Sequence, residues 1–130
     1  MKNKYGFGKI VTYPFLETIE RVKKALEKEG FGILTEIDVS EILQVKLNQQ
    51  TPPYLILGAC NPQLSHRALE IDPSIGLLLP CNVIIRQDNN QKVHVEFMDP
   101  KAILELVEEP KIALIAKEAR ERLEQVMEAL

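Results

Sequence analysis

Two spacings of apolar residues alternate along this sequence, and they constrain its fold more than any other feature. From residue 31 to 39 the period is two, with Phe31, Ile33, Thr35, Ile37 and Val39 on one side. From residue 15 to 26, apolar residues recur at intervals of four, three and four. The first spacing is typical of a half-buried strand and the second of an amphipathic helix. The chain is therefore predicted to mix strands and helices.

Turn and capping residues divide the chain into further elements. Gly30 stands where a helix from Phe15 would end, Ser40 where a helix would begin, and Asn61-Pro62 at the start of another. We expect strands at 4–13, 31–39 and 54–60, a hairpin at 81–98, and helices at 15–29, 41–48, 62–71, 99–107 and 111–130. The apolar run 54–60 is expected to be buried on both faces.

This order of elements predicts an α+β fold. Residues 1–130 would form a single compact domain, with one mostly antiparallel or mixed sheet and helices packed on one of its faces. The long helix at 111–130 carries an apolar stripe from Ile112 to Met127, which suits a protein core and an interface equally.

Composition argues against several classes of function. The net charge is −3 and the sequence contains no basic patch, so nucleic-acid binding lacks its electrostatic driving force. No signal-peptide pattern and no apolar run of about 18 residues are present, so neither secretion nor a membrane span is expected. With only two cysteines, these features predict a cytoplasmic protein with free thiols.

The segment from Gly58 to Arg86 holds both cysteines, and each is followed by asparagine. Cys60, His66 and Cys81 are spaced C-x5-H-x14-C, which matches no standard zinc pattern, so we predict neither a metal nor a cofactor. Cys60 precedes an expected helix N-terminus, where the helix dipole lowers a thiol pKa and favours catalytic or redox chemistry. The favoured interpretation is simpler: both cysteines are small buried residues at strand ends.

Two further pairs are candidate site residues. Glu36 and Asp38 lie on one side of the predicted strand 31–39, where they could act as acid and base or bind a cation, although a solvated strand face explains them equally. Asn61 and Asn82 are candidate ligand-binding residues, and structural capping is the favoured interpretation. The glycines match no nucleotide-binding motif.

Several ordered blocks carry a resemblance to a known family. GFGILTEIDV (30–39), LGACNP (57–62), HRALEIDPSIGLLLPCNV (66–83) and MDP (98–100) closely resemble the domain-of-unknown-function family 302. The resemblance implies a compact α+β domain, similar to the fold of TATA-box-binding proteins and often seen as a dimer. It implies no established reaction, and a likeness to a DNA-binding fold does not imply DNA binding.

These observations support two hypotheses about function. The first is a homodimeric module that binds a small-molecule ligand or a partner, with no membrane or nucleic-acid partner. The alternative is a small enzyme or thiol redox protein that uses Cys60 or Cys81, with help from Glu36, Asp38 or His66. The alternative requires these side chains to meet in one cleft.

Overall fold

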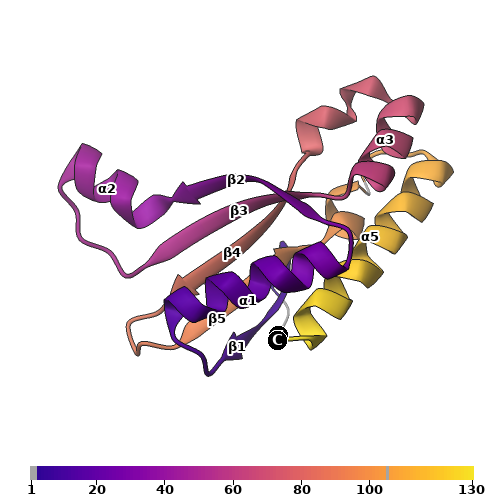
Figure 1. Cartoon of the computed structure of the whole chain (residues 1–130). Coiled ribbons are helices and arrows are strands. Elements are labelled where there is room, and N and C mark those ends of the chain that lie inside the picture. Colours follow the sequence, from indigo (N-terminus) through magenta and orange to yellow (C-terminus); the bar gives the residue numbers. More distant parts are fainter. Residues whose placement is uncertain (1–2, 105) are drawn as a thin grey trace.

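A computed structural model describes residues 3–104 and 106–130 and contains the predicted alternation of strands and helices (Figure 1). The strands are β1 (Gly6–Val11), β2 (Gly32–Asp38), β3 (Tyr54–Cys60), β4 (Cys81–Gln87) and β5 (Val93–Met98). The helices are α1 (Phe15–Lys28), α2 (Val39–Leu47), α3 (Pro62–Ile71), α4 (Pro100–Leu104) and α5 (Pro110–Glu128), with a 3-10 helix η1 (Pro73–Leu78). Helix α4 ends at Leu104 and is shorter than the predicted helix 99–107.

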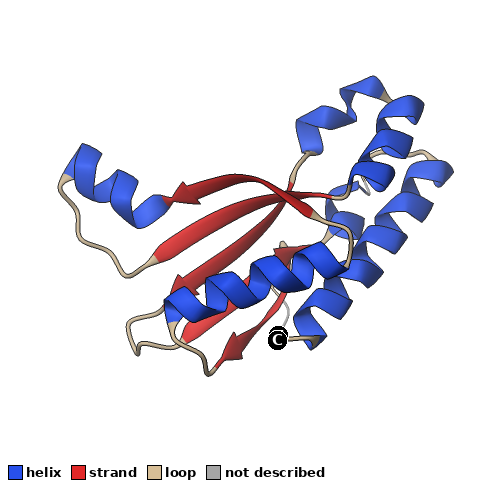
Figure 2. Ribbon diagram, viewed as in Figure 1, coloured by secondary structure: helices blue, strands red, loops and turns tan. Residues whose placement is uncertain are grey.

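The five strands form one antiparallel sheet in the order β1-β5-β4-β3-β2 (Figure 2). Strands β4 and β5 are the predicted hairpin, and the helices α1, α2 and α3 fall between the earlier strands. The α+β fold and the single domain are therefore confirmed.

The sheet residues of the main hydrophobic core all lie on one face. Paired residues share a face and neighbours alternate, so the register assigns every side chain to a side. Leu57 is paired with Val83, and Val83 with Phe97, which defines the core side across three strands. The remaining sheet residues of this core are Phe7, Val11, Leu55, Ala59, Ile85, Val93 and Val95.

We call the opposite side of the sheet the open face. Its residues include Ile10, Ile37, Tyr54, Ile56, Ile84, Arg86, His94 and Glu96. Among the described residues, none of these belongs to a hydrophobic core cluster. The expectation that residues 54–60 are buried on both faces is therefore wrong, because Tyr54 and Ile56 on the open face are only partly buried.

Helices α1 and α5 cover the core side of the sheet (Figure 1). Helix α1 buries Val22 and Leu26 completely, as its spacing predicts. Leu123 and Val126 of α5 join the same core, whereas Ile112, Ile115 and Ala119 join a second core with α3 and η1. The apolar stripe of α5 is thus used inside the chain, and this one helix links both cores.

A β-bulge changes the predicted faces of β2. The register shifts between Ile33 and Thr35, so Ile33 packs against the main core while Ile37 lies on the open face. The prediction that Phe31, Ile33, Thr35, Ile37 and Val39 share one side is wrong. The bulge adds one residue, and one added residue reverses the side of every residue that follows.

Helix α2 begins at Val39, two residues earlier than the predicted helix 41–48. Its N-cap is Asp38, whose Oδ1 accepts hydrogen bonds from the Glu41 N–H (3.0 Å) and the Ser40 hydroxyl (2.7 Å). Ser40 is therefore a helical residue and not the cap. None of the nine residues 39–47, all of which the structure describes, is buried.

Gly30 ends α1 in the way its position predicts. The Phe31 N–H reaches the Leu26 carbonyl (2.9 Å) and the Gly30 N–H reaches the Glu27 carbonyl (3.0 Å), which is a Schellman motif. Gly30 has φ +84°, and a Cβ there would lie 2.9 Å from Asn61 Nδ2. Glycine meets both requirements, for a left-handed conformation and for space.

We expect Gly30→Ala to reduce the free energy of unfolding by about 1–2 kcal/mol, because alanine disfavours this φ and crowds Asn61. Gly76→Ala is the matched control, since a Cβ there would lie 3.9 Å from Leu69 Cδ2, an ordinary van der Waals contact. We expect the control to be neutral or stabilising by less than about 1 kcal/mol. Equal losses in urea unfolding of the two variants would contradict this account.

Candidate functional site

The two cysteines line one small cavity at the end of the sheet. Cys60 ends β3 and Cys81 begins β4, and the register pairs Cys81 with Ala59, the neighbour of Cys60. The cavity has a volume of about 40 Å³. Side chains from both cores line it, among them Phe31, Leu64, Ile75, Ile115 and Ala119. The thiols therefore lie where the sheet meets α3 and α5.

The two thiols have different surroundings. Cys60 Sγ lies 2.8 Å from the Ser65 hydroxyl oxygen, in the second turn of α3. Burial, and to a lesser extent the nearby Cys60, raises the pKa of the Cys81 thiol to about 11. Cys81 is therefore protonated at neutral pH, and a protonated thiol is a poor nucleophile and metal ligand.

Asn61 connects three elements beside this cavity. Its side chain is 5% exposed, and its Oδ1 accepts from the Leu64 N–H (3.2 Å), which caps α3 as predicted. Its Nδ2 donates to the Glu29 carbonyl at the end of α1 (3.3 Å). Arg122 of α5 donates to the same carbonyl (3.1 Å). Both of these Asn61 hydrogen bonds hold the fold together, whereas Asn82 is exposed on β4.

The other predicted site residues lie elsewhere. Glu36 forms an ion pair with Lys23 of α1 (3.0 Å). On the neighbouring strand β3 it is paired with Leu57, which lies about 10 Å from Cys60 along that strand. Asp38 faces Leu55, about 17 Å from Cys60.

Both Asp38 and His66 have local partners. Hydrogen bonds from the Glu41 N–H and the Ser40 hydroxyl lower the pKa of Asp38, which is consistent with its role as a cap. The exposed His66 pairs with Glu70 one turn later on α3 (3.0 Å). The structure therefore does not bring Glu36, Asp38 or His66 to the thiols, and the enzyme hypothesis is not favoured.

A row of isoleucines on the open face is the feature that sequence reasoning missed. Ile37 is paired with Ile56, and Ile56 with Ile84, across β2, β3 and β4. We call Ile37, Ile56 and Ile84 the isoleucine row. It ends beside an ion pair between Arg86 Nε and Glu96 Oε2 (2.8 Å). The alternation of Val93, Val95 and Phe97 with His94 and Glu96 is the one sequence signal that marks this face.

A groove of about 430 Å³ joins α2 to this face. It is lined by Val39 and Leu43 of α2 and by Tyr54 and Arg86, which belong to the open face. The groove lies at the end of the sheet opposite the cysteines, because α2 follows Asp38 whereas Cys60 is paired with Gly32.

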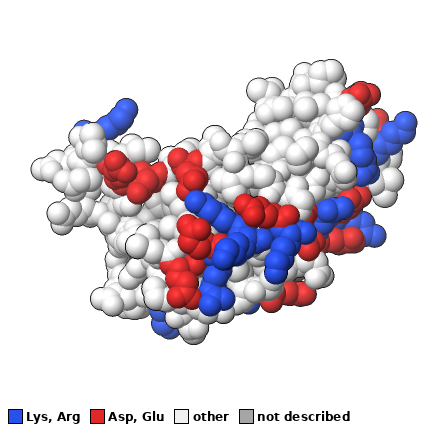
Figure 3. All heavy atoms as spheres, in the orientation of Figure 1, with Lys and Arg blue, Asp and Glu red and all other residues white. Residues whose placement is uncertain are grey.

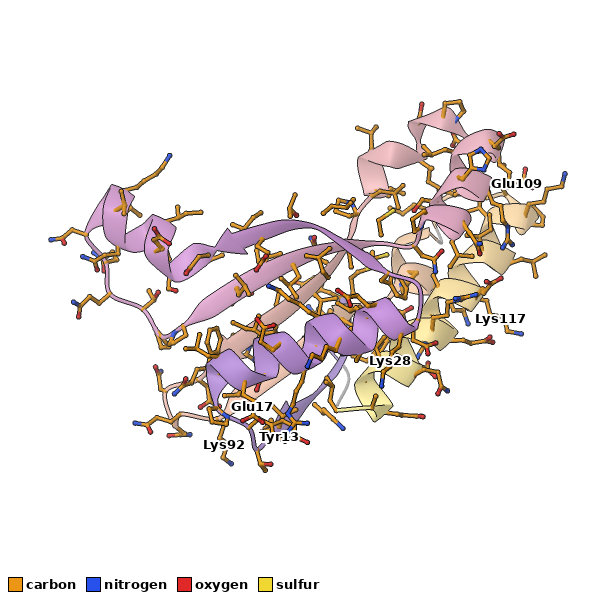
Figure 4. The ribbon with its side chains drawn as sticks, viewed as in Figure 1. Tyr13, Glu17, Lys28, Lys92, Glu109 and Lys117 are labelled. Atoms are coloured by element: carbon orange, nitrogen blue, oxygen red, sulfur yellow. The ribbon has the colours of Figure 1, made fainter. Side chains whose placement is uncertain are left out.

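Among the described residues, the charged side chains on the surface do not form a patch of one sign that would favour an anionic or a cationic ligand. Lys and Arg gather over α1 and α5 and lie among Asp and Glu (Figure 3). A hollow of about 780 Å³ along α5 has the same mixture, with Lys101, Lys117 and Arg120 beside Glu109 and Glu121. Figure 4 shows Glu109 near the start of α5 and Lys117 farther along it.

The comparisons with known proteins decide the family. The family model described as "Domain of unknown function DUF302" matches residues 7–130. The chain belongs to the DUF302 family. Its fold is similar to the crystal structure of an uncharacterised conserved DUF302 protein from Bacillus stearothermophilus, with 30% identity, a TM-score of 0.90, and coverage of 96% of this chain and 97% of the other. No curated protein matches the sequence.

The DUF302 fold of this chain shows two further properties. Within residues 3–104 and 106–130, no group of three or more His, Cys, Asp or Glu is arranged to hold a metal ion. In that same part of the chain, no helix has the length and apolar character needed to cross a membrane.

We expect Asn61→Ala to reduce the free energy of unfolding by about 1–2 kcal/mol, because the α3 cap and a buried hydrogen bond are both lost. Asn82→Ala is the control, since Asn82 follows the other cysteine and is exposed. We expect the control to stay within about 0.5 kcal/mol of the original chain. Urea unfolding measures both free energies. A larger reduction for Asn82→Ala than for Asn61→Ala would refute the role assigned to Asn61.

The raised pKa of Cys81 predicts a loss of stability at alkaline pH. The folded state holds the thiol proton up to about pH 11, whereas an unfolded cysteine releases it near pH 9.0, so rising pH favours unfolding above pH 9. Between pH 8 and pH 10 the free energy of unfolding of the original chain should fall by about 1 kcal/mol more than that of Cys81→Ala. If both proteins lose the same amount in urea unfolding, the thiol does not titrate as stated.

Proposed function

We propose that this chain is a homodimeric binding module, in which a second copy of the chain covers the open face of the sheet. The isoleucine row is the observation that carries the proposal. Ile37 is 41% exposed and Ile56 and Ile84 are partly exposed, and the three form a continuous apolar strip across three strands. Burying such a strip against another apolar surface is favourable by about 25 cal/mol per Å².

Helix α2 supports the same proposal. It has nine residues and exposes Ile42 (42%), Val45 (76%) and Leu47 (63%). A helix this short is marginally stable in water unless one side packs against something. Because the groove between α2 and the open face is continuous with both, one partner surface can cover α2 and the isoleucine row together.

The area of the open face supports including α2 in the interface. Five strands spaced about 4.8 Å apart, each about six residues long, give a flat area of roughly 480 Å². A stable interface buries about 800 Å² on each partner. The open face alone falls short of this value, and the exposed apolar residues of α2 extend it.

Two features favour a second copy packed face to face. The β2 edge carries a bulge, which discourages the pairing of sheet edges between two molecules. The Arg86–Glu96 ion pair satisfies its own charges on the open face, and Glu96 Oε1 also accepts from Asn3 Nδ2 (3.1 Å). A two-fold axis through the isoleucine row would therefore join like surfaces without leaving these charges unpaired.

A small ligand, if the module takes one, is proposed to bind in the groove between α2 and the open face. Its volume of about 430 Å³ lies within the range of ligand pockets, roughly 300–1,000 Å³. Tyr54 and Arg86 provide polar groups beside the apolar Val39 and Leu43.

Sedimentation equilibrium tests the dimer with matched variants. We expect the original chain to have about twice the monomer mass of 14.8 kDa at micromolar concentration. Ile37→Glu and Val45→Glu should each weaken the dimer by more than about 100-fold, because a charge would be buried without a partner.

The control is Leu77→Glu, which changes an apolar residue of η1 that is 89% exposed and lies away from the open face. We expect this variant to remain dimeric, and circular dichroism should show all three variants folded. A monomeric original chain at 100 µM, or a dimer that withstands both Ile37→Glu and Val45→Glu, would disprove the proposal.

A further inference from the structure

The positions of Cys60 and Cys81 are compatible with a direct bond between them. Cys81 faces Ala59 across adjacent strands, so the Cα atoms of Cys60 and Cys81 are separated by one strand spacing and one residue rise. Strand geometry makes this distance roughly 6 Å, within the range of about 4.4–6.8 Å that disulfides span.

The cavity supplies the space that the bond needs. Neighbouring side chains point to opposite faces within a regular strand, but Cys60 is the last residue of β3 and Cys81 the first of β4. Both residues line the same cavity of about 40 Å³, which exceeds the roughly 10–15 Å³ that a cavity needs to admit one water molecule. Charge on Cys60 contributes to the raised pKa of Cys81, which is consistent with the two thiols lying close together.

We propose that Cys60 and Cys81 form a reversible disulfide within one chain when a small hydroperoxide oxidises Cys60. This inference does not rest on the dimer, because the thiols and α2 lie at opposite ends of β2 and β3.

The reaction has two balanced steps. The Cys60 thiolate attacks one peroxide oxygen, the O–O bond breaks, and a sulfenic acid and a hydroxide (or alkoxide) ion form. The Cys81 sulfur then loses its proton and attacks the Cys60 sulfur, the S–O bond breaks, and water leaves. Overall, two thiols and one hydroperoxide give one disulfide, one water, and a second water or an alcohol.

The surroundings assign the order of the two cysteines. Cys60 Sγ lies 2.8 Å from the Ser65 hydroxyl oxygen at the edge of the cavity, so a polar group is available beside this sulfur. Burial raises the pKa of Cys81 to about 11, so its thiol stays protonated and does not compete for the peroxide. Cys81 then acts as the resolving thiol, and disulfide formation from the sulfenic acid should become faster as pH rises from 7 to 9.

Peptide mapping tests the bond directly. Trypsin places Cys60 in peptide 47–67 and Cys81 in peptide 68–86. After treatment with hydrogen peroxide and blocking of free thiols, we expect these two peptides to be linked, with a mass loss of about 2 Da that a reductant reverses. A mixture of ¹⁵N-labelled and unlabelled chains should give no mixed-isotope link, since the bond forms within one chain.

Two variants separate the roles of the thiols. Cys81→Ser should form a sulfenic acid at Cys60 that a dimedone reagent traps, with no linked peptides. Cys60→Ser should leave Cys81 at least about 10-fold slower to oxidise than Cys60 is in the original chain. The proposal fails if the original chain gives only sulfinic or sulfonic acids, if the links join different chains, or if Cys81 reacts first.

Discussion

The burial of one face of the sheet is the constraint on which the rest of this structure depends. Every sheet residue of the main core lies on the side covered by α1 and α5, from Phe7 on one edge strand to Leu57 near the other. The long amphipathic helix α5 packs on this side of the sheet. Its buried apolar residues, from Ile112 to Val126, belong to the two internal cores. What remains is a second face on which Ile37 is exposed and Ile56 and Ile84 are partly exposed. The proposed function follows from this asymmetry.

The covered side is held in place by a few polar contacts at one end of the sheet. Asn61 links the end of α1, the end of β3 and the start of α3, and Arg122 brings α5 to the same Glu29 carbonyl. Such contacts set the position of α3 and α5 relative to the sheet, and this position creates the cavity that both thiols line. The cavity and the groove beside α2 therefore lie at opposite ends of β3.

Local features of this chain could be predicted from its sequence, whereas features that depend on strand pairing could not. The Asn61-Pro62 cap and the end of α1 at Gly30 are recognisable because each uses residues close in sequence. The bulge after Ile33 depends on how β2 pairs with β3, and no residue in 31–39 marks it.

The candidate sites divide in the same way. The sequence of the run 54–60 does not indicate which of its residues face the core, because Leu55, Ile56 and Leu57 are all large and apolar. Asp38 caps α2 in place of Ser40, and the Ser40 hydroxyl itself donates to the capping carboxylate. The proximity of Cys60 and Cys81 is set by the β3–β4 register, which joins positions 21 residues apart.

The protection of the isoleucine row from solvent tests the central claim most directly. Methyl NMR of isoleucine-labelled protein with a soluble paramagnetic agent reports the exposure of each methyl group. The account predicts that Ile37, Ile56 and Ile84 are protected as well as Ile85, which is fully buried in the core. If the Ile37 methyl is instead broadened as a residue 41% exposed should be, no second copy covers the open face.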